Sequence, residues 1–195
     1  MHSITSPLIL SNTSEGDDPI FDSLFPILFE ALCMCFGYFP SSAQARKTFL
    51  RAFQETATVP QPPRNVNVCY FDLVPEKGPE PKYTTVRRKS DGHDEYSRTV
   101  PISLRLMIYG PEAEDYAWMI RTMLFSDAVK AKLRQNGIVP IPEPEEPISL
   151  PEIEGTRWRK RCDLSISLRI LQTFTAAGSS VLVPPVLNIN RNTVP

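Results

Sequence analysis

The sequence has few of the residues that build catalytic and metal-binding sites. It contains 2 histidines, 8 glycines and 4 cysteines in 195 residues. The cysteines, Cys33, Cys35, Cys69 and Cys162, lack the paired CxxC spacing of a structural zinc site and form no recognisable disulfide framework. Because most of them lie in apolar segments, we expect buried free thiols and a reducing compartment.

Sequence motifs for nucleotide binding and nucleophilic catalysis are also missing. The chain contains no GxSxG, GxxxxGK, GxGxxG or HExxH. His2 lies in a polar N-terminal segment, and Asp91, His93 and Asp94 have the composition of an ordinary turn. We therefore predict a protein that is not an enzyme and that needs no cofactor or metal; a hydrolytic site near His93 is the least favoured alternative.

Neither charge nor apolar length points to a membrane or to nucleic acid as the main ligand. Lys and Arg total 21 and Asp and Glu total 22, so the net charge of -1 creates no overall positive field. No run approaches the ~20 apolar residues that span a bilayer, and no signal peptide is recognisable. The sequence predicts synthesis in the cytoplasm and no membrane contact.

Proline, in contrast, is abundant. The chain has 20 prolines, about double the average frequency. They cluster at residues 60–63, 75–81, 140–151 and 184–185. Such clusters mark extended connections between structured blocks. We expect the connection from Ile138 to Pro151 to run extended over the surface.

The most informative stretch runs from Thr99 to Gly137. Alternating apolar residues from Val100 to Ile108 predict a strand with one buried face. After the break at Tyr109-Gly110-Pro111, we expect a helix that starts at Pro111. A new N-cap at Ser126-Asp127 predicts a second helix, which ends at Asn136-Gly137, where glycine closes the C-terminus. An apolar stripe at helical spacing consists of Ala113, Tyr116, Ala117, Ile120 and Leu124.

Three further segments are predicted to be strands. Residues Asn65–Val74 and Tyr83–Lys89 precede the Val100 strand, and a turn at Asp91-Gly92 suggests a meander. After a turn at Glu154-Gly155, apolar residues from Cys162 to Ile170 alternate with polar ones and predict a strand beside the Val100 strand. The fold class is therefore α+β, with a mostly antiparallel sheet of about four strands packed against helices.

Both ends of the chain have features of their own. We expect a flexible N-terminal arm at residues 1–18, one α+β domain at 19–171 and an extended C-terminal arm at 172–195. The aromatic residues Phe21, Phe25 and Phe29 lie in a helix that is apolar on nearly every side, which fits either a core helix or docking into a neighbouring subunit. Ser41-Ser42 predicts the cap of a second short helix with an apolar stripe at Ala45, Phe49, Ala52 and Phe53.

The C-terminal arm carries an apolar extended segment. Its residues are Val181, Leu182, Val183, Val186 and Leu187. An extended apolar segment pairs with a sheet edge or a groove. Docking on another subunit and packing on its own domain fit the sequence equally well.

Two basic clusters are candidates for contact with DNA or a partner protein. One consists of Arg87, Arg88 and Lys89, near the expected hairpin, and the other of Arg157, Arg159 and Arg161, which share a face of a strand. Acidic residues from 143–146 are the simplest compensating charges. A nucleic-acid-binding module that acts through residues 87–89 and 157–161 is the alternative function.

The order of these blocks resembles that of bacteriophage neck and tail terminator proteins. The resemblance covers Arg46 to Leu171 and includes the strand that ends in Tyr109-Gly110-Pro111, the helix that ends in Gln135-Asn136-Gly137, and the strand after Glu154-Gly155-Thr156-Arg157-Trp158. It implies a virion structural protein without catalytic residues, made in the host bacterial cytoplasm and located at the neck between head and tail.

The same resemblance implies a set of partners. Copies of the chain would form a ring, usually a hexamer, on the end of the tail tube protein, and this ring would contact a head-completion or stopper protein. A contractile tail would add contact with the sheath. Genome DNA would pass through the central channel without sequence-specific recognition.

Overall fold

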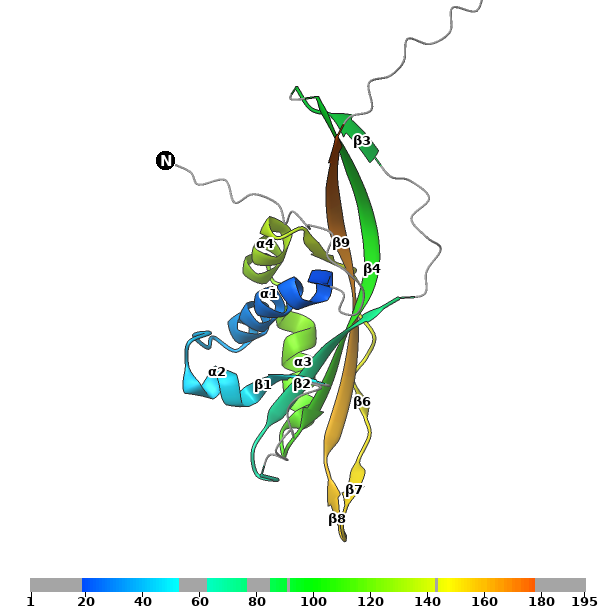
Figure 1. The fold of residues 1–195 in the computed structure, drawn as a ribbon. Coiled ribbons are helices and arrows are strands. Elements are labelled where there is room, and N and C mark those ends of the chain that lie inside the picture. Colours follow the sequence, from blue (N-terminus) through cyan, green and yellow to red (C-terminus); the bar gives the residue numbers. More distant parts are fainter. Residues whose placement is uncertain (1–18, 53–62, 77–84, 91, 143, 178–195) are drawn as a thin grey trace, which may run out of the picture.

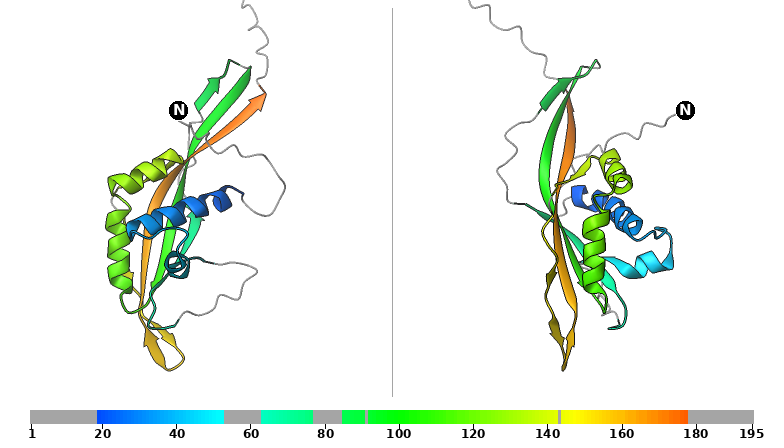
Figure 2. Two further views of the ribbon diagram at one scale, coloured as in Figure 1. Left: turned by 90° about the vertical axis from the view of Figure 1, so that its left-hand side faces the viewer. Right: turned by 180° about the vertical axis from the view of Figure 1, so that it is seen from behind.

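The protein has two layers, a twisted β-sheet and a group of helices that covers one of its faces (Figure 1). The computed structural model describes residues 19–52, 63–76, 85–90, 92–142 and 144–177. The upper ends of the longest strands and a small hairpin at the lower end extend beyond the helical layer (Figure 2). Within the described residues, no helix covers the opposite face of the sheet, which we call the open face.

The elements of the described residues are as follows. The helices are α1 (Pro19–Cys35), α2 (Ala43–Thr48), α3 (Ala113–Met123) and α4 (Asp127–Gln135). The strands are β1 (Phe49–Arg51), β2 (Val68–Pro75), β3 (Thr85–Arg88), β4 (His93–Tyr109), β5 (Ile138–Pro140), β6 (Ile148–Ser149), β7 (Glu152–Glu154), β8 (Arg157–Arg159) and β9 (Arg161–Ala177).

The main sheet is mixed rather than purely antiparallel. It has 7 strands in the order β1-β2-β4-β9-β5, with β3 paired to β4 and β6 paired to β9, while β7 and β8 form a separate ladder. All pairs are antiparallel except β1 and β2. The expected α+β class with a mostly antiparallel sheet is confirmed, but the expected number of about four strands is wrong. Short strands before β2 and within the proline-rich connection account for the difference.

The proline-rich connection runs along the outer edge of β9. Ile138–Pro140 pairs with residues 168–170 of β9, and Ile148–Ser149 pairs with residues 162 and 163. Between them, Ile141 N donates to Ser167 O over 2.9 Å. Prolines are tolerated at a sheet edge because one side of the strand needs no ladder hydrogen bonds.

The centre of the sheet is the long antiparallel pair of β4 and β9. Each strand has 17 residues, and the pairing is continuous from His93–Ala177 to Tyr109–Arg161. The inward side chains are buried, as their alternation predicted: Ile102, Leu104, Leu106, Ile108, Cys162, Leu164, Ile166, Leu168 and Ile170. Each large aliphatic side chain buried here contributes about 1.5–3 kcal/mol.

The predicted meander of β2, β3 and β4 is wrong. Both β2 and β3 pair with the same edge of β4, where β2 takes residues 102–109 and β3 takes residues 94–97. This arrangement is possible because β4 is long enough to accept two strands end to end. The part of β4 that pairs with β3 extends beyond the helices (Figure 2).

The two helices after β4 follow the predicted stripe closely. Ala113, Ala117, Ile120 and Leu124 are buried, and α4 begins at Asp127 as expected. However, α3 begins at Ala113 rather than Pro111, and the Ser126 side chain makes no cap hydrogen bond. Gly137, with φ of 71°, closes α4 in the left-handed conformation as predicted.

The N-terminal helix belongs to the core of its own subunit. Phe25 is 8% exposed and packs 5.6 Å from the ring of Phe71, while Phe29 lies edge-on to Phe49. The core interpretation of α1 therefore holds for Phe25 and Phe29. Phe21 lies within α1, but its side chain is outside the described part of the helix.

The second helix is shorter than its pattern indicated. Ser42 Oγ accepts a hydrogen bond from Ala45 N over 3.1 Å, which confirms the predicted cap. The helix ends at Thr48, and Phe49–Arg51 forms β1 in parallel with Cys69–Phe71. The expected helical stripe through Ala52 is thus wrong because pairing with β2 overrides it. Phe53 lies outside the described residues.

The turn between β4 and α3 depends on close contact at Gly110. Its φ is 131°, and a Cβ atom there would lie 2.2 Å from Asn67 Oδ1 and 2.7 Å from Asn67 Cα. The Asn67 side chain donates to Glu112 Oε2 and accepts from Glu112 N. Only glycine therefore fits between β4 and the start of β2.

We predict that Gly110→Ala lowers the free energy of unfolding by about 3 kcal/mol or more, because it combines backbone strain with overlap on the Asn67 backbone. Urea denaturation measures the loss. Gly37→Ala is the matched control: Gly37 also has a positive φ of 65°, but no atom lies within 4 Å of its added Cβ. The control should lose only about 1 kcal/mol. Equal losses would contradict this account of the turn.

The cysteines are buried free thiols, as predicted. Burial raises the pKa of Cys33 to about 11 and that of Cys35 to about 12. Burial also raises the pKa of Cys69 and Cys162 above the usual range. Since the thiolate is the reactive form, each buried thiol is almost entirely protonated and unreactive at neutral pH.

We expect no thiol of the native protein to react rapidly with Ellman's reagent at pH 8. All 4 cysteines should react after denaturation in guanidinium. Reactivity of the native protein should remain low up to pH 9, because the raised pKa values keep the thiols protonated there. A fast-reacting thiol in the native protein at pH 8 would contradict the described burial.

Candidate assembly surfaces

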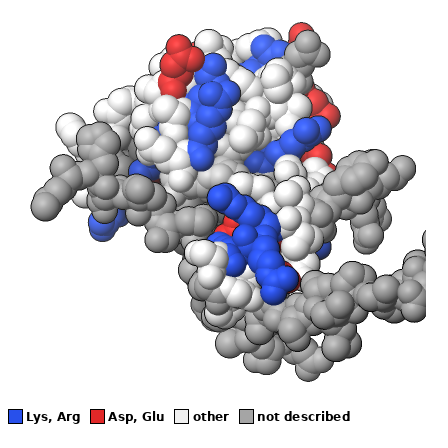
Figure 3. Space-filling view, turned by 90° about the horizontal axis from the view of Figure 1, so that it is seen from above, with Lys and Arg blue, Asp and Glu red and all other residues white. Residues whose placement is uncertain are grey.

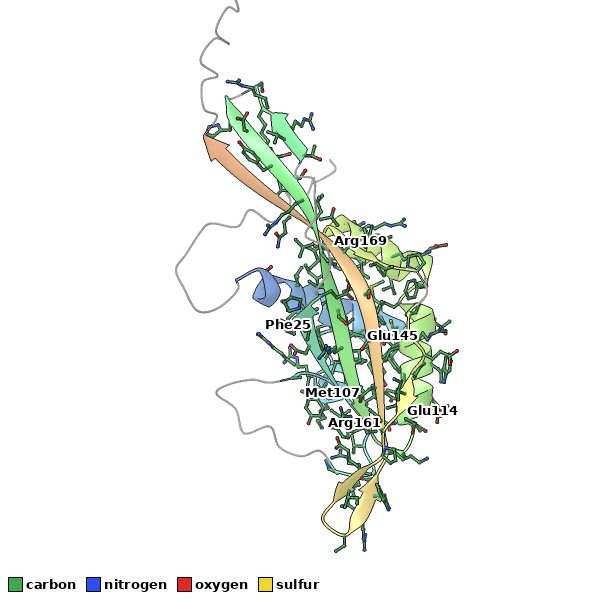
Figure 4. The ribbon with its side chains drawn as sticks, turned by 90° about the vertical axis from the view of Figure 1, so that its right-hand side faces the viewer. Phe25, Met107, Glu114, Glu145, Arg161 and Arg169 are labelled. Carbon is green, nitrogen blue, oxygen red and sulfur yellow. The ribbon has the colours of Figure 1, made fainter. Side chains whose placement is uncertain are left out.

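The open face of the sheet is polar because polar side chains alternate with the buried apolar ones along each strand. Asp72, Arg105 and Ser165 are neighbours across β2, β4 and β9. Figure 4 looks onto this face, with Met107 and Arg161 on it and the helices behind. Oppositely charged neighbours such as Asp72 and Arg105 are favourable across an antiparallel pair.

A groove of about 660 Å³ crosses the open face. Its floor includes Ser103, Ser165 and Ser167, which are small, and its walls are the end of β2 and the proline-rich segment 141–145. Ser167 Oγ donates a hydrogen bond to the Glu76 carboxylate across the groove. The serine floor is polar, but the walls include Val74, Pro75 and Ile141, so the groove offers both hydrogen-bonding and apolar contacts.

The proline-rich wall of the groove is hydrogen-bonded to α3. The Arg121 guanidinium donates to the carbonyl oxygens of Pro144 and Glu145 over 3.1 and 3.2 Å. It also lies 5.1 Å from the ring of Trp118, at cation–π distance. Arg121 thus connects the outer face of α3 with the edge of the sheet.

A cluster around Tyr109 holds the lower hairpin. Arg159 lies 4.8 Å and Arg161 5.6 Å from the centre of the Tyr109 ring. Arg161 donates two parallel hydrogen bonds to Asp163, of 2.6 and 2.7 Å, and pairs with Glu152. Burial raises the pKa of Tyr109. The hydrogen bonds that Arg161 donates to Asp163 raise the pKa of Arg161, so this residue stays charged.

The structure therefore brings two of the three predicted arginines together. Arg159 and Arg161 meet over Tyr109, and Arg159 is buried, whereas Arg157 is exposed on β8. Among the described residues, the carboxylates that pair with Arg161 are Glu152 and Asp163 and not the expected Glu145 or Glu146, while residue 143 lies outside the described part of the chain. Arg161 therefore forms its ion pairs within its own subunit.

The other basic cluster lies near the upper end of the molecule. Arg87 and Arg88 are exposed on β3 and stand opposite Glu95 and Asp94 of β4. Lys89 forms an ion pair with Glu95 over 2.6 Å. Basic side chains are prominent when this end is viewed from above (Figure 3). Because acidic neighbours face the cluster, its positive field is weaker than the sequence alone indicated.

The predicted C-terminal docking residues lie beyond the last described residue, Ala177. These residues are Val181, Leu182, Val183, Val186 and Leu187. β9 itself continues to Ala177, so its pairing with β4 extends past residue 171. Docking of the C-terminal segment remains a prediction.

Two exposed apolar surfaces were not identified from the sequence. The hairpin surface consists of Ile153 and Trp158, which face each other across β7 and β8. The α3 surface consists of Trp118, Met119 and Met123, which lie outside the buried stripe of α3. Met119 and Met123 are one helical turn apart, and Trp118 lies about 100° around the helix from Met119. A signal for the second was present, since these three residues do not belong to the apolar stripe of the helix.

Among the described residues, no group of three or more His, Cys, Asp and Glu side chains is arranged to hold a metal ion. Among the same residues, no helix has the length and apolar character needed to cross a bilayer.

Large apolar side chains exposed on a well-packed α+β body are typical of a subunit of a larger protein assembly. Comparison with known protein families identifies the assembly. The family described as "Phage neck terminator protein" matches residues 24–194. The chain therefore belongs to this family, and it is a structural protein of the bacteriophage virion, located at the neck. A search of curated proteins finds no significant match.

We predict that Arg161→Gln lowers the free energy of unfolding by about 1–2 kcal/mol, because it removes a bidentate pair that is partly screened by solvent. Arg161→Lys should recover less than half of this loss, since an ammonium cannot match two carboxylate oxygens in parallel. Thermal denaturation at fixed salt provides the measurement. Arg157→Gln is the control and should change stability by less than about 0.5 kcal/mol. Equal stability of all three variants would show that the cluster does not hold the hairpin.

Proposed function

We propose that the protein forms a ring at the neck that ends the tail tube and joins the tail to the head. The observation that carries this proposal is the family match over residues 24–194, because it assigns the chain to the neck terminators. A terminator must cover the end of a growing tube, and a ring of identical subunits can match the symmetry of such an end. The resemblance noted in the sequence implies a hexamer.

The exposed surfaces support a head-to-tail arrangement of subunits. A ring that closes around one axis uses two different surfaces of each subunit, which meet at every contact. This chain carries the hairpin surface at its lower end and the α3 surface on its helical side, and the two differ in shape and composition. Such a pair fits a ring better than a two-fold dimer, in which one surface meets itself.

In this proposal the two ends of the ring have different partners. One face contacts the tail tube protein, and the other contacts a head-completion or stopper protein; a contractile tail would add the sheath. Genome DNA passes through the channel without sequence-specific contacts. The acidic residues opposite Arg87 and Arg88 favour passage of DNA over tight binding, because they reduce the local positive charge.

We expect the purified protein to form rings of a single size at micromolar concentration, visible by negative-stain electron microscopy and with one mass by native mass spectrometry. When the rings are added during polymerisation of the cognate tail tube protein, average tube length should fall as the ratio of ring to tube protein rises. Tube protein alone is the control. A subunit that stays monomeric and leaves tube length unchanged would refute the proposal.

A further inference from the structure

The β7–β8 hairpin exposes an apolar pair where a soluble monomer would place polar residues. Ile153 is 65% exposed and Trp158 69% exposed, and they stand opposite each other across the ladder. The hairpin extends from the lower end of the sheet, beyond the helices (Figures 1 and 2). A tryptophan side chain is among the residues that contribute most to binding when an interface covers them.

The other side of this hairpin is fixed to the body of the subunit. Arg159 lies over Tyr109, and Glu152 pairs with Arg161. At the end of β8, Lys160 Nζ donates to Pro111 O over 3.4 Å, and Lys160 O accepts from Gly110 N over 3.3 Å. The alternation of the strands then directs Ile153 and Trp158 away from these contacts. A hairpin held in this way loses little conformational entropy when it binds.

The α3 surface has the composition that complements this pair. Trp118, Met119 and Met123 are 41%, 44% and 38% exposed. Methionine side chains adapt their shape to an inserted aromatic residue and make favourable sulfur–aromatic contacts. Buried Ala117 and Ile120 occupy the other side of α3, so the helix needs no further packing within its own subunit.

Charge also favours contact between these two surfaces. Lys160, two residues after Trp158, is exposed and basic, whereas the exposed residues in the first turn of α3 are Glu114 and Asp115. Figure 4 labels Glu114 on the outer side of α3. Opposite charge at the rim of an apolar contact speeds association and suppresses incorrect pairing.

We propose that the hairpin surface of one copy packs on the α3 surface of the next copy, with Ile153 and Trp158 against Trp118, Met119 and Met123. The partner is thus a second copy of this chain, and the inference rests on the proposed ring. Both surfaces are exposed in one subunit, so they do not cover each other within it. Contact between copies covers both at once and leaves one of each at the two ends of any open chain of subunits.

The test removes one surface at a time and then mixes the variants. The hairpin variant is Ile153→Ser with Trp158→Ser, and the α3 variant is Met119→Glu with Met123→Glu. Each should weaken subunit association by at least about 30-fold and give monomers under conditions in which the wild type forms rings. An equimolar mixture should form a dimer of the two variants, because each variant retains the one surface that the other lacks.

Phe39→Ser is the matched control. Phe39 is 78% exposed, between α1 and α2 and outside both surfaces, so this variant should keep the ring. Circular dichroism of each variant establishes that the chain has folded. If either surface variant keeps the ring, or if folded variants fail to form the dimer, the inference is wrong while the proposed ring stands. A wild type without rings would refute both.

Cross-linking provides a second readout that does not depend on weakened association. The four native cysteines are buried, so a new pair of exposed cysteines should dominate oxidation. Trp158→Cys combined with Met119→Cys should give disulfide-linked oligomers under mild oxidation, whereas Trp158→Cys combined with Phe39→Cys should give few. Equal cross-linking of the two pairs, or none in the first, would overturn the inference.

Discussion

The antiparallel pairing of β4 and β9 supports every other part of the structure. With 17 residues in each strand, the ladder is about 55 Å long, which exceeds the width of the helical layer that covers it. Its inner face is apolar from Ile102 to Ile108 and from Cys162 to Ile170, and the helices pack on this part alone. The remainder of the ladder extends beyond the core. It pairs with β3 at one end and continues into the β7–β8 hairpin at the other. One continuous pair of strands thus produces both the core and the projecting parts.

The lower end of this ladder joins the core to the exposed surfaces. Gly110 allows β4 to turn into α3 against Asn67. Two residues later, Glu112 N donates a hydrogen bond to the Asn67 side chain, and the Glu112 carboxylate accepts one from it. Beside this turn, Tyr109 lies under the guanidinium groups of Arg159 and Arg161. The hairpin and α3 therefore leave the sheet at the same place and keep a fixed relation to each other. In a ring, such rigidity would set the angle between neighbouring copies.

The distribution of charge also follows from the fold. Arg161 is neutralised by Asp163 and Glu152, and Lys89 pairs with Glu95, so two of the basic residues noted in the sequence form ion pairs within the subunit. The lower end exposes the apolar pair Ile153 and Trp158, and α3 exposes Trp118, Met119 and Met123 after an acidic first turn. These are features of protein contacts. They agree with membership of the neck terminator family more closely than with nucleic-acid binding.

The sequence by itself determined the elements whose side chains alternate or repeat regularly, because such patterns depend only on local geometry. The inward face of β9, the stripe of α3, the caps at Ser42 and Gly137 and the buried cysteines all follow from it. Only the tertiary structure decided which strands pair: β1 replaced a predicted helical turn at Phe49 because β2 offered a parallel partner, and β3 joined β4 end to end with β2. It also decided that Glu152, from another strand, meets Arg161, whereas Asp163 lies two residues along β9 on the same face as Arg161. Finally, it decided which apolar residues stay uncovered, since exposure of Trp158 depends on where the hairpin leaves the sheet.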